Sequence, residues 1–193
     1  FDDGPDPVWT PRLAAVLRRF DIPATFFCIG QRVEIYPDIV RSLIDGGHEI
    51  GNHSHTHRNL WYRGRTQVRH EIERCQTALS ALTANVPTLF RPPFGDRGPQ
   101  VLSEARKLNL STVLWSLDTR DWNSPTAETL SHDVRNRTRD GDILLFHDGS
   151  HDNRFADRSS TLAAVTELAL WSIERQFEFV TVSTLMESAR GNV

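Results

Sequence analysis

Cysteine is scarce in this chain. Cys28 and Cys75 are the only two among 193 residues, too few for a disulfide framework or for a metal site built on thiolates. Cys28 lies in an apolar run over residues 24–29, where we expect a buried thiol that packs as a small hydrophobic side chain. Sequence spacing gives no distance between the two sulfur atoms, so a disulfide and the redox compartment are both left open.

Long hydrophobic runs and a strong charge imbalance are also missing. Apolar runs such as residues 143–146 are the size of a strand and far below the roughly 20 residues that a membrane-spanning helix needs. A formal net charge of -3 argues against nucleic acid as the main partner. Glycine-rich nucleotide-binding turns of the G-x-G-x-x-G or P-loop type are absent. The composition is otherwise that of an ordinary globular protein.

Predicted helices and strands alternate along the chain. Apolar spacing and turn residues predict strands over residues 24–29, 88–91, 111–117, 142–146 and 177–182, and helices over 10–20, 37–45, 65–82, 100–108, 126–138 and 161–175. This alternation predicts an α/β fold in which outer helices cover parallel strands. Because polar motifs directly follow the strands, a closed or distorted (β/α) barrel fits better than an open sheet. With no repeat, linker or low-complexity stretch, we expect one domain over residues 1–193.

Two histidines and two aspartates carry the strongest chemical signal. His53 and His57 are four residues apart, and on a helical turn they would project from one face and could share a metal ion. Asp2 and Asp3 are adjacent carboxylates that can diverge at a strand end, so that one reaches the ion and the other a water molecule. One oxygen and two nitrogen ligands suit zinc, cobalt or another first-row divalent ion, with coordination positions open for water and substrate. The intervening His55 is expected to face away. This set is typical of a metal-assisted hydrolase.

Three further polar residues follow predicted strands. Arg91, Asp121 and His147 each come shortly after a strand, so in a parallel sheet they would point into one mouth. An arginine beside Asp2 would keep that carboxylate ionised and oriented. A histidine beside a carboxylate can act as a general acid near neutral pH. Taken singly, the three residues also fit a surface ion pair, a helix cap and a core histidine.

Five short blocks in order make the pattern specific. The chain resembles the polysaccharide deacetylase family, that is, the NodB-homology domain of carbohydrate esterase family 4. The span from the first block to the last covers about three quarters of the chain, and the blocks are Phe1-Asp2-Asp3-Gly4-Pro5, His53-Ser54-His55-Thr56-His57, Arg91-Pro92-Pro93-Phe94-Gly95, Asp118-Thr119-Arg120-Asp121-Trp122 and Leu144-Leu145-Phe146-His147-Asp148.

The resemblance implies a role for each matched position. Asp2 is expected to be the general base and Arg91 to hold it, while Asp121 is expected to pair with the general acid His147. The remaining matched positions are the metal ligands and the substrate-binding residues, namely Asp3, His53 and His57 for the metal, and Pro93, Phe94, Trp122 and Leu145 for the acetyl group. The family more often has tyrosine where Phe94 stands. Since the expected contribution is a backbone N–H to the oxyanion, the missing hydroxyl should cost little.

The implied activity is removal of acetyl groups from N-acetylglucosamine units of a peptidoglycan-type or chitin-type glycan, with zinc as the first expectation for the metal. One alternative is an O-acetyl esterase that acts on acetylated xylan with the same groups. An alternative of another class is a non-catalytic glycan-binding domain, in which exposed aromatic rings stack on sugars. Candidate rings for such stacking are Trp61, Tyr62, Trp115 and Trp122, although the complete catalytic set argues against a pure binder.

The resemblance also implies a setting for the chain. The expected partner is an acetylated glycan, with no nucleic acid and no membrane span in this segment, and we expect a monomer that is secreted or located in the cell envelope. Phe1 already belongs to the first block, so we expect the first strand to be truncated at its N-terminal side. The polar residues 149–159 are expected to form a loop at the mouth of the site. His151 stands four residues after His147, but Gly149 disfavours a helical turn there, so we expect no second metal site.

Overall fold

Short parallel strands form the centre of the protein. The computed structural model describes residues 1–83, 85–153 and 155–191. One sheet has the order β1 (Thr25–Cys28), β2 (Glu49–Asn52), β3 (Leu89–Phe90) and β4 (Ser111–Thr112), and a second sheet pairs β5 (Leu117–Asp118) with β6 (Leu144–Leu145). All of these strand pairs are parallel. The α/β class with parallel strands is therefore confirmed.

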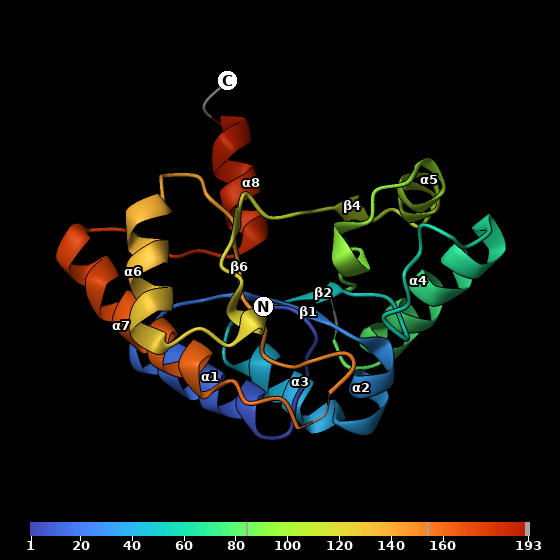
Figure 1. Ribbon diagram of the computed structural model, residues 1–193. Coiled ribbons are helices and arrows are strands. Elements are labelled where there is room, and N and C mark those ends of the chain that lie inside the picture. The colour runs from blue at the N-terminus through green and yellow to red at the C-terminus, as the bar shows by residue number, and fades with distance from the viewer. Residues whose placement is uncertain (84, 154, 192–193) are drawn as a thin grey trace.

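The first residues of the chain join the two sheets. Asp2 forms a parallel bridge with Phe27 on one side and with His147 on the other. The backbone N–H of Asp2 donates to the Phe146 carbonyl at 2.9 Å, and the N–H of Phe27 donates to the Phe1 carbonyl at 2.8 Å. Figure 1 shows the N-terminus near the middle of the molecule, between β6 and β1. Asp2 thus lies at the seam of a distorted barrel rather than at its edge.

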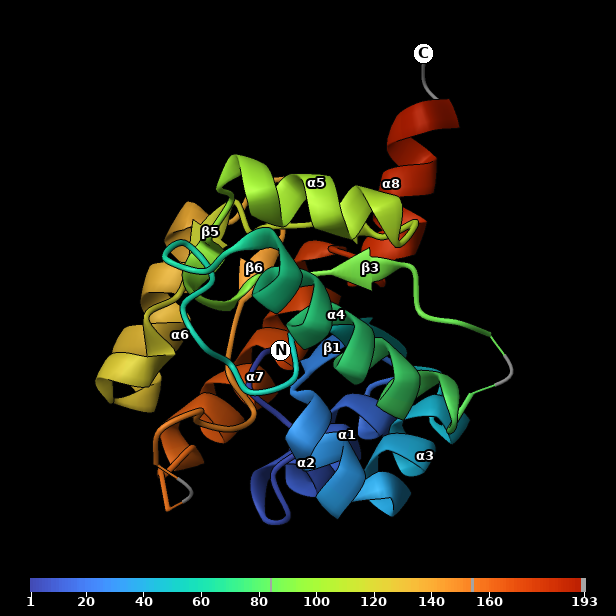
Figure 2. The same ribbon diagram turned by 90° about the vertical axis from the view of Figure 1, so that its right-hand side faces the viewer.

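Helices surround the strands. They are α1 (Trp9–Arg19), α2 (Gly30–Ile35), α3 (Pro37–Asp45), α4 (Arg65–Ser80), α5 (Pro99–Lys107), α6 (Ala127–Arg137), α7 (Ser159–Arg175) and α8 (Val182–Gly191). Helices α6 and α7 pack together on one side of the strands and α4 and α5 on the other, as Figures 1 and 2 show. Within the described ranges, no helix has both the length and the apolar character needed to cross a bilayer.

Three buried clusters hold the strands in the described part of the chain in place. The largest includes Leu13 of α1 and Phe26 of β1, each at most 1% exposed. The second includes Phe90 of β3, which is fully buried. The third includes Phe27 of β1 and Leu89 of β3, which are 1% and 3% exposed. Burying one such side chain contributes about 1.5–3 kcal/mol. The clusters fix β1 and β3 from both sides, so the carboxyl ends of the strands meet at one place.

The prediction and the structure differ in several elements. The helix α2 was not expected, because it begins directly after β1 without a turn signal. The predicted strand over residues 111–117 is two strands, β4 and β5, which belong to different sheets. The predicted strand over 177–182 is wrong, since Phe177 stacks on Trp171 at 5.0 Å and Val182 begins α8. The segment before α8 is irregular, and Phe177, Phe179 and Val180 in it are half-buried.

The two cysteines are free and buried, as expected for packing thiols. The Cys75 thiol donates to the Cys28 carbonyl at 3.3 Å. Burial raises the pKa of Cys75 to about 12 and raises the pKa of Cys28 well above its ordinary value. Both sulfur atoms therefore stay protonated, and neither is an activated nucleophile.

Candidate active site

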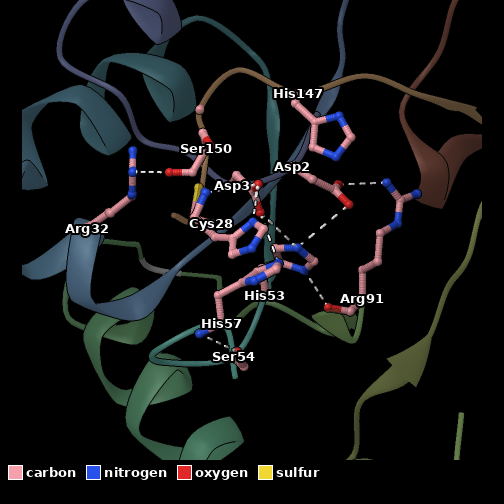
Figure 3. Close-up of polar contacts among 12 residues, drawn as sticks. Asp2, Asp3, Cys28, Arg32, His53, Ser54, His57, Arg91, His147 and Ser150 are labelled. Carbon is pink, nitrogen blue, oxygen red and sulfur yellow. Dashed lines mark hydrogen bonds and ion pairs between the residues drawn. The ribbon is translucent and has the colours of Figure 1, made fainter. Parts of the chain in front are cut away.

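Asp2 is a buried carboxylate held by a buried arginine. Its side chain is 3% exposed, and Arg91 Nη1 lies 2.8 Å from Asp2 Oδ1 (Figure 3). The Arg91 guanidinium in turn lies over the Phe27 ring, 4.1 Å from its centroid. Burial raises the pKa of Asp2, but the positive charge of the adjacent Arg91 guanidinium opposes burial, and the pKa falls below its ordinary value. Asp2 is therefore an ionised, oriented carboxylate.

Asp3 turns its side chain away from that of Asp2. Its backbone is left-handed, with φ 73°, so the two adjacent carboxylates diverge as the sequence indicated. Asp3 Oδ1 lies 3.0 Å from His57 Nε2 and 3.5 Å from His53 Nε2. His53 Nδ1 lies 2.6 Å from the Arg91 carbonyl. Because a carbonyl only accepts, Nδ1 carries the proton and Nε2 presents its lone pair to Asp3.

This arrangement fits a divalent cation. Asp3 Oδ1 is buried and has no hydrogen-bond partner in the part of the chain that the structure describes, although two imidazole nitrogens face it. A metal with ligand bonds of about 2.0–2.1 Å in tetrahedral geometry has ligand atoms roughly 3.3 Å apart. The separations of 3.0 and 3.5 Å lie close to that value. Asp3, His53 and His57 thus offer the donor set that a first-row ion requires.

A second buried pair joins His147 and Asp121. His147 Nδ1 lies 2.7 Å from Asp121 Oδ1, and the His147 backbone N–H donates to Asp121 Oδ2 at 2.9 Å. The Thr161 hydroxyl also donates to Oδ2, at 2.9 Å. Burial lowers the pKa of His147, but the hydrogen bond and the charge of Asp121 reverse this effect and raise the pKa above its ordinary value. Nε2 is the ring nitrogen left to face a substrate, and Figure 3 shows His147 beside Asp2.

The four residues expected to bind the acetyl group divide by burial. Phe94 and Trp122 are 56% and 55% exposed, whereas Pro93 and Leu145 are buried. The Phe94 ring meets the His57 ring edge-on at 4.8 Å, and its backbone is left-handed with φ 59°. Such a conformation is uncommon for a bulky residue and clusters at functional sites. Phe94 is thus the one of the four that contacts the histidine pair.

The histidine pair reaches Asp3 by a different local structure from the one predicted. The prediction of a helical turn was wrong, because residues 53–57 form an irregular loop after β2 with left-handed Ser54 and His57 at φ 62° and 54°. These two positive φ angles, rather than the i, i+4 spacing on a helix, bring the rings together, with centroids 4.8 Å apart. His55 faces away as expected: it is 1% exposed, and its Nε2 lies 3.9 Å from Glu34.

Sequence reasoning missed one residue of the site. Asp3, His57 and His151 offer ligand atoms that all lie within 4.8 Å of one another. His151 was set aside because Gly149 disfavours a helical turn after His147, and no helical turn is present. The loop instead folds back over Asp3. The sequence signal for His151 was a histidine in the polar loop that follows the fifth block, which ends at Asp148.

Comparisons with known proteins agree with this site. Residues 1–113 match the family model described as polysaccharide deacetylase. A peptidoglycan-N-acetylglucosamine deacetylase of Bacillus cereus is 37% identical over 96% of this chain and 85% of its own length. A chitooligosaccharide deacetylase of Azorhizobium caulinodans is 38% identical over 86% of this chain and 82% of its own. The solved structure of the peptidoglycan deacetylase PdaC from Bacillus subtilis has a TM-score of 0.89 at 29% identity, covering 100% of this chain and 90% of that one.

Proposed function

Since this chain belongs to the polysaccharide deacetylase family, we propose that it is a metal-dependent hydrolase that removes acetyl groups from N-acetylglucosamine units of a peptidoglycan-type or chitin-type glycan. One observation carries the proposal. An ionised carboxylate, Asp2 held by Arg91, and a histidine of raised pKa, His147 held by Asp121, lie on two segments joined by a parallel bridge beside Asp3. Amide hydrolysis needs this combination of a base and an acid at one carbonyl.

The base step rests on Asp2. A bound divalent ion supplies Lewis acidity, which lowers the pKa of a water molecule and polarises the acetyl carbonyl. Asp2 accepts the proton of the attacking water, and Arg91 keeps the carboxylate ionised and fixed for that transfer. The backbone N–H of Phe94 donates to the oxyanion that forms on the acetyl group. Removing one such donor costs about 10²–10³ in kcat in comparable sites.

The acid step rests on His147. Cleavage of the C–N bond leaves a sugar amine, which is a poor leaving group unless it is protonated. His147 Nε2 donates that proton, while Asp121 at Nδ1 holds the ring in place and stabilises its charged form. The products are acetate and a glucosamine unit.

We propose zinc as the ion and the cell envelope or its outside as the location. One carboxylate oxygen and two imidazole nitrogens suit zinc, while cobalt and other first-row ions fit the same donors. The relative from Bacillus cereus is named for action on peptidoglycan, a polymer of the cell wall, which supports a location at that polymer.

Two other functions remain candidates. An O-acetyl esterase on acetylated xylan would use the same base, acid and metal ligands, because only the leaving atom differs. A glycan-binding role without turnover draws support from Trp61, Tyr62 and Trp122, whose side chains are 54%, 84% and 55% exposed. The intact pairs Asp2–Arg91 and His147–Asp121 favour hydrolysis over binding alone.

Acetate release from protein loaded with zinc tests these functions side by side. The substrates are N-acetylglucosamine oligomers, peptidoglycan and acetylated xylan, each with and without a chelator. We expect release from at least one of the first two, loss of activity with chelator, and recovery when zinc is added back. Release from xylan alone would replace the proposal with the esterase. No release from any of the three, with zinc bound, would favour the binding function.

A further inference from the structure

The loop that follows His147 is held firmly against Asp3. A Cβ atom on Gly149 would lie 2.5 Å from the Asp3 carbonyl oxygen, so only glycine lets the chain pass this close. Arg158 Nε and Nη2 both donate to the Gly149 carbonyl, at 2.9 and 2.7 Å. Arg32 donates to the Ser150 carbonyl, a contact drawn in Figure 3. The backbone directly before residue 151 is therefore fixed by two arginine side chains.

His151 faces the carboxylate that His53 and His57 also face. Its Nδ1 lies 3.4 Å from Asp3 Oδ2, and its backbone N–H donates to the same oxygen at 3.2 Å. Its ring stacks on the His57 ring at 4.2 Å and meets the Phe94 ring edge-on at 5.2 Å. The side chain is 32% exposed. A third imidazole thus borders the same carboxylate from the open side of the site.

We propose that His151 Nδ1 is an additional protein ligand of the divalent ion that the proposed function places on Asp3, His53 and His57. The inference rests on that function only for the presence of the ion. Four protein donors would close a tetrahedral site. A first-row ion that is five- or six-coordinate keeps one or two positions open for water and the acetyl carbonyl. His151 therefore sets both the affinity and the coordination number of the metal.

A hydrogen bond from the ring to Asp3 is the competing role. The 3.4 Å between Nδ1 and Oδ2 is long for an N–H···O bond, whose usual length is about 2.9–3.0 Å. The ligand atoms that Asp3, His57 and His151 offer lie within 4.8 Å of one another, which is close enough for one ion to contact all three residues. The backbone N–H of residue 151 already donates to Oδ2, so the ring is not needed to orient Asp3.

Two substitutions separate these roles. His151→Ala removes the ring but keeps the backbone N–H that bonds Asp3. His151→Asn places an amide near the position of Nδ1, which can donate a hydrogen bond but is a poor ligand for a first-row ion. His132→Ala is the matched control, because His132 is an exposed histidine of α6 that contacts Asn136. Circular dichroism of each variant establishes that the fold is retained.

The measurement is the dissociation constant for Zn²⁺, by competition with a chromophoric chelator, together with the visible spectrum of Co²⁺-loaded protein. We expect both His151 variants to bind Zn²⁺ at least about 10-fold more weakly. Mutating a residue that only supports a metal ligand already weakens metal binding by about 10- to 100-fold. We also expect both His151 variants to change the Co²⁺ spectrum. His132→Ala should change neither the Zn²⁺ dissociation constant nor the Co²⁺ spectrum. Affinity within twofold of wild type in His151→Ala, or full recovery in His151→Asn, would overturn the inference.

Failure of this inference and failure of the proposed function give different results. Metal affinity and the Co²⁺ spectrum need no substrate, so they report on His151 even if the wild-type protein releases no acetate. A wild-type protein that releases acetate while His151→Ala binds Zn²⁺ normally would retain the proposed function and remove His151 from the metal site.

Discussion

At the scale of single residues, the site works by pairing each titratable group with a partner that fixes its charge. Arg91 keeps Asp2 ionised despite its burial, and Asp121 keeps His147 protonable despite burial that opposes its charge. Removing one member of a buried ion pair typically costs about 3–5 kcal/mol, because the other charge is left uncompensated. Each pair therefore needs both of its members, because either charge alone would be buried without compensation.

The pairing of His147 with Asp121 predicts a pH effect. A general acid must be protonated, so activity is lost as pH rises through the pKa of His147, which Asp121 raises. Asp121→Asn removes that charge, and burial then lowers the pKa of His147. We expect kcat to fall by about 10²–10⁴ and the alkaline limb of the kcat–pH profile to move toward lower pH.

The same substitution at Asp118, whose Oδ1 accepts from the Arg120 N–H, is the control. It should leave the alkaline limb in place. An unmoved limb in Asp121→Asn would mean that another group limits activity at high pH.

At the scale of elements, the sequence predicted which strand ends carry chemistry but not how the loops after them fold. Arg91 and His147 follow β3 and β6 as expected, because apolar runs and the polar residues behind them are local signals. The left-handed angles of Ser54 and His57, by contrast, depend on packing that no local pattern records. His151 was missed for the same reason, since its approach to Asp3 depends on contacts between residues far apart in sequence.

The anchoring of residues 149–158 predicts a stability effect. Arg158 is 5% exposed and donates twice to the Gly149 carbonyl. Arg158→Met keeps much of the apolar stem but leaves that carbonyl without its charged donor. We expect a loss of about 1.5–3 kcal/mol in the free energy of unfolding by urea, the range for a hydrogen bond to a charged group.

Arg106→Met, on the exposed face of α5, should change the free energy of unfolding by less than about 0.5 kcal/mol. Equal effects of the two substitutions would show that the bonds from Arg158 to Gly149 do not hold the loop.

At the scale of the whole molecule, the site joins two sheets that local patterns could not separate. The predicted strand over residues 111–117 looked continuous, yet β4 and β5 belong to different sheets, and Asp2 bridges the gap between those sheets. The polar motifs behind the strands favoured a barrel, whereas periodicity alone predicted only the alternation of helix and strand. Since Asp3 lies far in sequence from His53 and His57, an ion bound to all three would tie the start of the chain to the loop after β2.

Metal binding should therefore stabilise the fold. An ion that binds the folded chain and not the unfolded one adds RT ln(1 + [L]/Kd), about 4.1 kcal/mol at a thousandfold excess over Kd. We expect the melting temperature to rise when Zn²⁺ is added to chelator-treated protein, and to rise much less in His57→Ala. Identical melting curves with and without Zn²⁺ in the wild-type protein would exclude a metal site formed by folding.

The most direct test of the central claim is kcat for Asp2→Asn on N-acetylglucosamine oligomers, in protein loaded with zinc to the wild-type level. The substitution keeps the size of the side chain and an acceptor for Arg91 but removes the proton acceptor. We predict a loss of about 10²–10⁴ in kcat, with zinc content and circular dichroism unchanged. A kcat near the wild-type value would contradict the role of Asp2 as the base of this site.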